Sequence, residues 1–471
     1  MVAALMLAVL AQPVDVAITV QGEAVARVPE RFFGTHYDGP RHKFWDALLG
    51  REVLSQESTF TSPSGRRWLS EAGVQVARLF VDIQAVHPEP GQWELGPTEA
   101  IVEDIRAAGM EPMACLNQRG GEWFVGDAKE PWWKDQRGLE EWRAASRRLA
   151  QALKGKCGRF EILNEPNHIH PDQDHYMGWD TSVALFRLAA QEIKAVIPDA
   201  TCGGPASWAA WETAEWAGRA LEDGRAAPLL DFVSYHIYTS HNLDDSDQAI
   251  CAKMRWFEDT PTYIKGKLKA LTERPIQALL TECNVSAVCF KDGKPYQDPR
   301  NTSAFGGVWM ASALLHSALG GCDQAIHFST LGGLGIIRWP PEWAPQPCYW
   351  VLPMLRNAAG LKPGAQMLDT RSSEEPVEVS QVVQGKSKDY GLEAFAVGSE
   401  DGLAVVLVNK RSDRTYRATV VAPKKPTAAE LYRYTTERTA DAPYRDGRVE
   451  PTQGGLVVEC RPYSVTVLAW R

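Results

Sequence analysis

Two glutamates stand directly after apolar runs, each with a small polar neighbour. Glu165 belongs to Asn164-Glu165-Pro166, and Glu282 belongs to Thr281-Glu282. One carboxyl group can donate a proton to a bound molecule, while a second carboxylate attacks that molecule or activates water. Each glutamate alone also fits a structural role. Asn-Glu-Pro can be a plain loop, and Glu282 can pair with an arginine such as Arg78.

The segments that carry these glutamates belong to an alternating series of strands and helices. Alternation of apolar strands with amphipathic helices predicts a parallel sheet covered by helices. Eight such units within residues 31–362 predict an α/β fold, a closed (β/α)8 TIM barrel, because that number suits a barrel better than an open sheet. The expected strands are 31–37, 74–82, 111–117, 159–164, 200–205, 231–238, 276–282 and 324–329.

Polar side chains gather where these strands end, which is the functional face of a TIM barrel. Any one of them could cap a loop, but their convergence on one rim favours a site. Strands four and seven, which carry Glu165 and Glu282, face each other across the mouth, and two opposed carboxyl groups suit cleavage of a glycosidic bond. The other polar residues at strand ends are His36, Arg78, Asn117, Asn164, His236 and Tyr238.

The two ends of the chain differ from this pattern. Residues 363–471 contain short alternating strands separated by turns, which predicts an accessory antiparallel β-sandwich. Residues 14–30 are expected to form a hairpin that joins the sandwich. Residues 1–13 are apolar and resemble a secretory signal, so a secreted or periplasmic location is expected. The basic start of a signal is missing, and a buried strand or a disordered tail is the alternative.

Charge and composition exclude several classes of protein. The 471 residues include 50 Lys and Arg against 59 Asp and Glu, a net charge of −9, which disfavours nucleic acid as a partner. No apolar run is long enough to span a membrane. Nine cysteines without a C-x-x-C pair argue against a zinc ribbon, and their pairing stays open. The oligomeric state also stays open.

Cofactor and metal signals are weak. The glycines at 332, 333 and 335 are too few for a phosphate loop and follow the wrong strand. His168, His170 and His175 follow Glu165, but they lack the carboxylate pattern of a metal site. We therefore expect neither a cofactor nor a metal.

Tryptophan is abundant, with 17 residues. Trp123, Trp132 and Trp133 lie in the loop that follows the third strand. Indole rings stack on the flat faces of sugars, so these three are candidate substrate-binding residues. Apolar packing within a long loop is the alternative.

Four stretches resemble a known group of enzymes. The chain resembles the retaining glycoside hydrolases of clan A, which carry catalytic carboxylates after strands four and seven, and within the clan it is most similar to glycoside hydrolase family 39. The resemblance covers residues 31–330. The matching stretches are Phe160–Asn167, Ile193–Ala206, Asp231–Tyr238 and Leu280–Ser286.

The resemblance implies a role for each matched residue. Glu165 is similar to the acid/base, and Glu282 is similar to the nucleophile. Asn164 resembles the residue that binds the sugar 2-hydroxyl, and Arg78 resembles an arginine near the nucleophile. The strand-six residues that brace the carboxylates correspond to His236 and Tyr238.

Two positions depart from the family pattern. The eighth strand lacks its usual tryptophan, for which Phe328 or Trp339 would substitute. Cys283 stands where an aromatic residue is common. Both departures affect the first sugar subsite and therefore the identity of the substrate.

The sequence thus predicts a retaining glycoside hydrolase that acts on a poly- or oligosaccharide by double displacement. A non-catalytic glycan-binding barrel protein is the alternative, because barrels host many functions. A metal-dependent barrel hydrolase is a third reading. The sugar, the linkage, the preferred anomer and endo or exo action stay undetermined.

Overall fold

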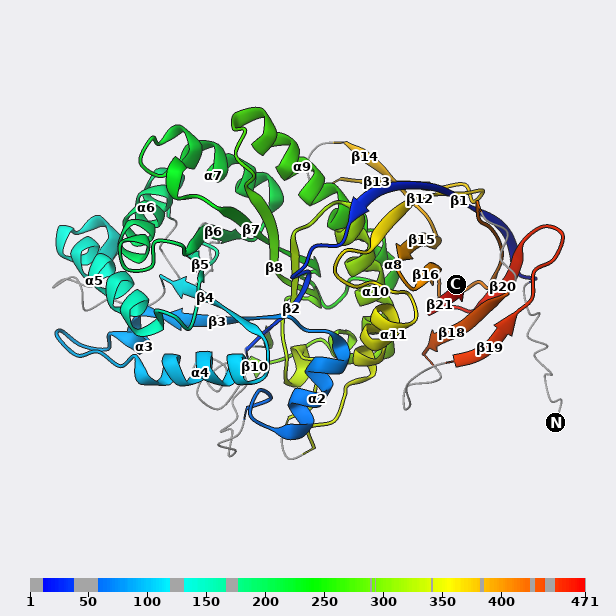
Figure 1. Cartoon of the computed structure of the whole chain (residues 1–471), viewed down its shortest axis with the longest axis horizontal. Coiled ribbons are helices and arrows are strands. Elements are labelled where there is room, and N and C mark those ends of the chain that lie inside the picture. The colour runs from blue at the N-terminus through cyan, green and yellow to red at the C-terminus, as the bar shows by residue number, and fades with distance from the viewer. Residues whose placement is uncertain are drawn as a thin grey trace.

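The structure is a computed structural model of the whole chain, shown in Figure 1, with a barrel beside a large sheet. The residues that it describes are 12–37, 58–118, 131–166, 177–288, 290–292, 294–339, 342–381, 385–423, 428–436 and 445–470. Most of the signal-like segment lies outside them. No helix within these ranges is both long and apolar enough to cross a membrane.

Eight parallel strands close into the barrel, which confirms the predicted fold class. Going around the barrel, the order is β11-β2-β3-β4-β5-β6-β7-β8. Their bounds are β2 Phe33–His36, β3 Val76–Asp82, β4 Glu111–Asn117, β5 Arg159–Ile162, β6 Thr201–Ser207, β7 Phe232–Ser240, β8 Gln277–Ser286 and β11 Gln324–His327.

Side chains fill the barrel interior, and helices cover its outside. One interior layer consists of Val76, Met113, Phe232, Leu279 and Ile326, each from a different strand. Strands buried on both faces read as continuous apolar runs, which is why these segments stood out in the sequence. The helices are α2 Pro63–Ala72, α3 Ile83–Val86, α4 Gly96–Ala107, α5 Gln136–Leu153, α6 Trp179–Val196, α7 Ala210–Glu222, α8 Asp247–Cys251, α9 Trp256–Leu271, α10 Ala304–Leu319 and α11 Val351–Asn357.

The accessory domain is one nine-stranded, mostly antiparallel sheet in the order β19-β18-β21-β16-β15-β12-β1-β17-β20. Its end strands β19 and β20 contact each other, so the sheet curls around its own apolar core. Its strands are β1 Val14–Arg27, β12 Gln366–Ser372, β15 Leu392–Ser399, β16 Gly402–Asn409, β17 Tyr416–Val421, β18 Ala429–Thr435, β19 Arg445–Val449, β20 Leu456–Cys460 and β21 Ser464–Trp470.

The N-terminal segment joins this sheet, but the prediction of a hairpin there was wrong. Residues 14–27 form a single strand, β1, that pairs antiparallel with β12 and parallel with β17. Gly22 has a φ of 81°, and the register shifts around it, so the chain bends there without reversing. Ile18 and Arg27, on either side of the bend, both pair with β12, which leaves no room for a returning strand.

Helix α10 joins the two domains. Its residues 304–318 are all buried, as expected for a helix that is apolar all round. It contacts the barrel strand β8 on one side and β1, β16 and β21 of the sheet on the other. One continuous apolar core therefore runs from the barrel through α10 into the sheet.

A buried charge cluster lies at this junction. His316 on α10 bonds to Glu258 Oε2 of α9 at 2.8 Å and to Glu393 Oε1 of β15 at 2.9 Å. The Lys410 ammonium lies 2.7 Å from the same Glu393 oxygen and also pairs with Asp389. We call this set, with Arg255, which pairs with Glu258, the junction cluster.

Candidate active site

Arg78 lies at the centre of the barrel mouth and is fully buried. It comes from the middle of β3, a strand buried on both faces, so its charge needs partners inside the barrel. Its Nε donates to Glu161 Oε2 at 2.6 Å, and its Nη1 donates to Glu282 Oε1 at 2.6 Å. Its Nη2 donates to Asn164 Oδ1 at 2.7 Å. One guanidinium thus fixes three side chains, of which Glu161 and Asn164 come from β5 and the residues just after it and Glu282 comes from β8.

Glu161 is a member of this site that the sequence analysis missed. It lies inside β5 and is fully buried. Burial alone would raise its pKa, but the charge of Arg78, helped by His236, lowers the pKa below its ordinary value. Glu161 is therefore a fixed negative charge that balances Arg78. The signal for it was a charged residue within an apolar parallel strand, which requires a buried partner.

Glu282 is held through both of its oxygens. Arg78 binds Oε1, and the Tyr238 hydroxyl donates to Oε2 at 2.8 Å. Tyr238 comes from β7, the neighbouring strand, and Glu282 is 6% exposed. The carboxylate therefore has a fixed orientation at the floor of the mouth.

Glu165 follows β5 in a tight backbone turn. Leu163 and Glu165 have φ values of 75° and 46°, in the left-handed region that non-glycine residues rarely adopt. Three hydrogen bonds hold this turn: Leu163 N to Leu116 O, Asn164 N to Gln118 Oε1, and Glu165 N to Ala206 O. Gln118, a second residue that the sequence analysis missed, also donates to the Asn164 carbonyl at 2.8 Å.

His236 lies between the two candidate catalytic glutamates. Its Nδ1 is 2.7 Å from Glu165 Oε1 and 3.7 Å from Glu282 Oε2. One ligating atom from each of these three residues lies within 4.8 Å of the others. One oxygen of Glu165 and one of Glu282 therefore lie within 4.8 Å of each other, a close approach of the kind that a retaining pair of carboxylates uses.

The same three residues are the only group within the described ranges with the makeup of a metal site. Their atoms already have other partners, however. Arg78 and Tyr238 donate to the two oxygens of Glu282, and His236 Nδ1 binds Glu165. A cation would compete with the buried guanidinium, so this donor set fits a metal poorly. The three histidines at 168, 170 and 175 lie outside the described residues.

Aromatic rings form one wall of the mouth. The His36 ring lies 4.5 Å from Phe80 and 5.0 Å from Phe328, measured between centroids, and all three side chains are buried. Phe328, the residue directly after β11, therefore belongs to this wall. Trp339 packs instead on Gly332, where a Cβ would come within 2.3 Å of the indole nitrogen.

The remaining candidates divide between the mouth and the core. Asn117 donates to Asp82 Oδ1 at 2.8 Å, which ties the ends of β3 and β4 together at the mouth. Trp132 is 3% exposed and packs on Trp142, so its expected role as an exposed sugar platform is not supported. Trp133 is half-buried against the same core. Trp123 lies outside the described residues.

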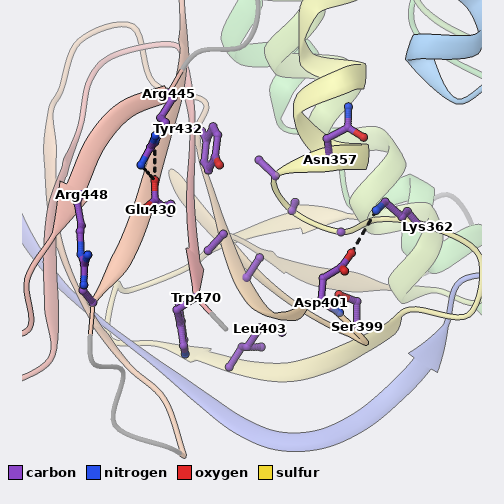
Figure 2. Close-up of a pocket in the computed structure, with 17 residues that line it drawn as sticks. Asn357, Lys362, Ser399, Asp401, Leu403, Glu430, Tyr432, Arg445, Arg448 and Trp470 are labelled. Atoms are coloured by element: carbon purple, nitrogen blue, oxygen red, sulfur yellow. Dashed lines mark hydrogen bonds and ion pairs between the residues drawn. The ribbon is translucent and has the colours of Figure 1, made fainter.

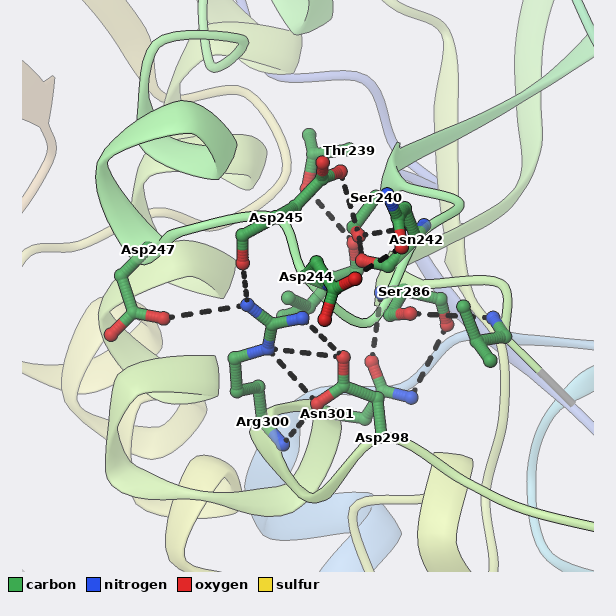
Figure 3. A network of polar contacts seen from close by, with 12 residues as sticks. Thr239, Ser240, Asn242, Asp244, Asp245, Asp247, Ser286, Asp298, Arg300 and Asn301 are labelled. Atoms are coloured by element: carbon green, nitrogen blue, oxygen red, sulfur yellow. Dashed lines mark hydrogen bonds and ion pairs between the residues drawn. The ribbon is translucent and has the colours of Figure 1, made fainter. Parts of the chain in front are cut away.

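A polar network fixes the loops that follow β7 and β8 (Figure 3). Arg300 binds both oxygens of Asp298 and also lies 3.6 Å from Asp247. The Asn301 side chain accepts from the Ser286 amide at 2.9 Å, and the Ser240 hydroxyl donates to Asp245 at 3.0 Å. Arg300 is thus paired with two carboxylates, and the network supports the ends of the strands that carry His236, Tyr238 and Glu282.

Cys283, beside Glu282, faces the core. Its sulfur lies 3.5 Å from the Ile326 carbonyl, and burial raises the pKa of the thiol. The eight cysteines in the described part of the chain are all buried and free. Adjacent strand residues point to opposite faces, which explains why Glu282 faces the mouth and Cys283 does not.

A cavity of about 790 Å³ lies away from the mouth, between the end of α11 and the curled sheet (Figure 2). Its lining includes Lys362, Asp401, Glu430 and Arg445. These charges pair within the cavity, Lys362 with Asp401 and Arg445 with Glu430. It contains none of the residues that converge at the barrel mouth, which remains the candidate active site.

Comparisons with known proteins agree on the fold. No family model and no curated protein matches the sequence. Among solved structures, the GH51 arabinofuranosidase from Xanthomonas axonopodis pv. citri is similar with a TM-score of 0.67 and 13% identity, over 97% of this chain and 100% of that one. A monomeric β-xylosidase from Caulobacter crescentus CB15 is similar with a TM-score of 0.62 and 15% identity, over 97% of this chain and 99% of that one.

A third similar structure, a GH30 endoxylanase from Clostridium papyrosolvens C71, gives a TM-score of 0.59 at 13% identity, over 96% of this chain and 99% of that one. All three alignments include both the barrel and the sheet. The chain therefore shares the fold of these three structures, an eight-stranded barrel with an attached β-sheet domain.

Proposed function

We propose that the protein is a retaining glycoside hydrolase that cleaves O-glycosidic bonds of a poly- or oligosaccharide. The observation that carries this proposal is the convergence of Glu165, His236 and Glu282, with ligating atoms within 4.8 Å, at the ends of barrel strands four, six and seven. Retention requires closely spaced carboxyl groups, since the nucleophile must reach the anomeric carbon without an intervening water.

In the first step, a Glu282 oxygen attacks the anomeric carbon, and the glycosidic carbon–oxygen bond breaks. Glu165 gives its proton to the departing oxygen. In the second step, Glu165 takes a proton from water, the water oxygen bonds to the anomeric carbon, and the bond to Glu282 breaks. The sugar is released with its original anomeric configuration, and both glutamates return to their starting states.

The surrounding residues prepare these roles. Arg78 keeps Glu282 paired with a cation, and Tyr238 orients its second oxygen. His236 holds Glu165 through Oε1. Because Asn164 Oδ1 is engaged by Arg78, the amide nitrogen of Asn164 is the atom that it can offer to the sugar 2-hydroxyl. The small exposed parts of Phe80 and Phe328 would face the ring of the sugar that is cleaved, and the fully buried His36 ring packs against both phenyl rings.

Within the clan, we propose a family 39-like enzyme that acts outside the cytoplasm. The motifs at 160–167 and 280–286 and the signal-like start support this part of the proposal. The three similar structures are described as an arabinofuranosidase, a β-xylosidase and an endoxylanase, so pentose-containing oligosaccharides are the first substrates to test.

The test begins with aryl α- and β-glycosides of xylose, arabinose and glucose, followed by proton NMR of the first-formed sugar. We expect retention of configuration. With a substrate that has a good leaving group, the Glu165→Ala variant should accumulate a sugar bound covalently to Glu282. The first step then needs no acid, whereas the second step lacks its base. Mass spectrometry of peptides would locate the adduct. An inverted product would contradict the mechanism, and binding without turnover would favour a glycan-binding protein.

A further inference from the structure

Two exposed tryptophans lie three residues apart in the segment that follows β6, a strand of the barrel. Trp208 follows β6 directly and is 41% exposed, while Trp211 lies in the first turn of α7 and is 45% exposed. Within the described ranges, they are the only aromatic residues among the exposed large hydrophobic side chains. Large aromatic surface left in water next to a site favours ligand contact over packing.

Trp208 is connected to the candidate active site through side chains. Its ring meets His241 edge-on at 6.5 Å between centroids, and His241 lies 6.3 Å from Tyr238. Tyr238 in turn bonds to Glu282. Trp208 therefore belongs to the same rim as the two candidate catalytic glutamates.

Glu212 anchors Trp208 from below. The Glu212 side chain is only 7% exposed and shares a hydrogen bond with Trp208. Burial raises its pKa to about 7, and the negative charges of Glu215 and Glu165 add to the effect. Its Oε2 is buried without a hydrogen-bond partner. The bond to Glu212 gives the Trp208 indole a buried polar partner, which restricts the rotation of the ring.

The position of β6 decides which sugar this surface would meet. β6 lies between β5, which leads to Glu165, and β7. The acid must stand beside the leaving oxygen, so the leaving-group sugar extends past Glu165. The wall of His36 and Phe328 lies at β2 and β11, on the other side of the mouth. The two aromatic surfaces thus flank the bond to be cleaved.

We propose that Trp208 and Trp211 form a subsite that stacks a neutral sugar of the leaving group, and that Glu212 is a positioning residue that orients Trp208. This inference rests on the proposed function. We expect a neutral sugar because Glu215 lies one helical turn after Trp211 on α7, near enough to raise the pKa of Glu212 by its negative charge, and its carboxylate would repel a uronic acid.

The kinetic test compares kcat/KM for an oligosaccharide with kcat/KM for an aryl glycoside of the same sugar, using the full chain and xylotetraose, cellotetraose and arabinotetraose. Trp208→Ala should lower this ratio by ~10-fold or more, since loss of an aromatic stacking partner removes both area and ring geometry. Trp208→Phe should restore most of it. Leu271→Ala, which removes an equally exposed apolar side chain at the far end of α9, should leave the ratio unchanged.

Glu212 is tested by the same ratio. Glu212→Gln keeps a hydrogen-bond acceptor for the indole and should stay within about 2-fold of the parent, whereas Glu212→Leu should approach the effect of Trp208→Ala. If Glu212→Leu changes thermal stability but not the ratio, Glu212 has only a structural role and the positioning role is overturned.

Binding separates this inference from the proposed function. Calorimetric titration of the Glu282→Gln variant with the three neutral tetrasaccharides needs no turnover. If the wild type proves inactive but Trp208→Ala weakens binding, the subsite stands while the hydrolase proposal fails. If adding Trp208→Ala leaves the affinity for the tightest-binding tetrasaccharide unchanged, the subsite is overturned. Equal binding of tetragalacturonate would overturn the neutral-sugar assignment.

Discussion

The barrel mouth and the junction cluster both bury several charged side chains, but they balance them differently. The junction sets three cationic side chains, Arg255, His316 and Lys410, against three carboxylates, Glu258, Asp389 and Glu393. A fourth carboxyl group, Asp259, lies 4.0 Å from Arg255 at the edge of the cluster, and burial raises its pKa. At the mouth, Arg78 is the one permanently charged cation in contact with Glu161 and Glu282, and Glu165 adds a third carboxyl group beside His236.

This difference separates stability from chemistry. The junction cluster satisfies its own charges, and Glu393 accepts from Ser312, His316 and Lys410. The mouth retains an excess of carboxyl groups, and its Glu165 side chain is 16% exposed. Negative charge facing an opening can stabilise the positive oxocarbenium-like transition state of glycoside cleavage. The paired charges of the junction cluster therefore stabilise the contact between the domains, while the excess carboxyl groups of the mouth are available to a substrate.

The sharpest test of the comparison is Glu282→Gln. We expect turnover of an aryl glycoside to fall by roughly 10³-fold or more, because the amide is a poor nucleophile. Stability should change little, since Arg78 keeps its bond to Glu161 at 2.6 Å. The readouts are kcat and urea unfolding. Retention of more than about a tenth of the activity, under ~1.4 kcal/mol in the barrier, would exclude Glu282 as the nucleophile.

Glu393→Gln should give the opposite result. It leaves Lys410 and His316 buried with too little negative charge, and breaking a buried pair in this way costs about 3–5 kcal/mol. Urea unfolding should show this loss, whereas kcat per folded molecule should match the wild type. A variant that stays stable but loses turnover would mean that the junction also serves the site.

The pH dependence of stability sharpens the comparison further. Burial alone would raise the pKa of Glu393, but Lys410 and His316 lower it to about 2 from an ordinary 4.5. Its contribution to stability is therefore complete above pH 4.5 and is lost as the pH falls toward 2. Burial alone would lower the pKa of His316, but Glu393 and Glu258 raise it above 6.5. That contribution is complete below pH 6.5 and is lost as the pH rises through the raised pKa.

The junction should thus contribute most to stability between pH 4.5 and 6.5. Urea unfolding from pH 3 to 9 would measure this directly. In the His316→Gln variant, we expect the decrease in stability above pH 6.5 to become shallower than in the wild type. Parallel curves for the two proteins would show that His316 does not titrate with folding.

The smallest effect is expected for Cys283→Ser. Cys283 lies next to the candidate nucleophile in sequence but faces the core, where burial raises the pKa of its thiol. Activity should stay within about 2-fold, with a loss of ~1–3 kcal/mol in stability from a buried hydroxyl. Labelling of native protein with a thiol reagent, followed by activity measurement, is the check. Inactivation in step with modification of Cys283 would contradict this orientation.

Much of the barrel could be predicted because its strands are apolar on both faces and end in polar residues. The convergence of Arg78, Asn164, His236 and Glu282 followed from strand order alone. The sequence left two interpretations of Glu282 open, a structural ion pair with Arg78 and a catalytic carboxylate. In the structure Glu282 pairs with Arg78 and also lies close to Glu165. A buried ion pair and a candidate nucleophile are here the same carboxylate.

Other features depend on packing that no local pattern shows. The members of the junction cluster, such as His316 and Lys410, come from separate elements without a motif. The abundance of tryptophan does not show which rings are exposed. Trp132, which was predicted to bind sugar, is buried, whereas Trp208 and Trp211, which were not predicted, are exposed. The single strand β1 was taken for a hairpin because Gly22 resembles a turn residue, although the chain only bends there.

The pairing of β1 also sets the order of events during synthesis. Asp15 on β1 binds Arg417 on β17, 402 positions later in the chain. At ~5–20 residues per second, a ribosome needs roughly 20–80 s to cover that distance. β1 lacks both strand neighbours until β12, at residues 366–372, has been made, and it lacks its second neighbour until β17 follows. Strand β1 is thus made long before its partners, and it exposes an unpaired edge to cellular chaperones until β17 has been made.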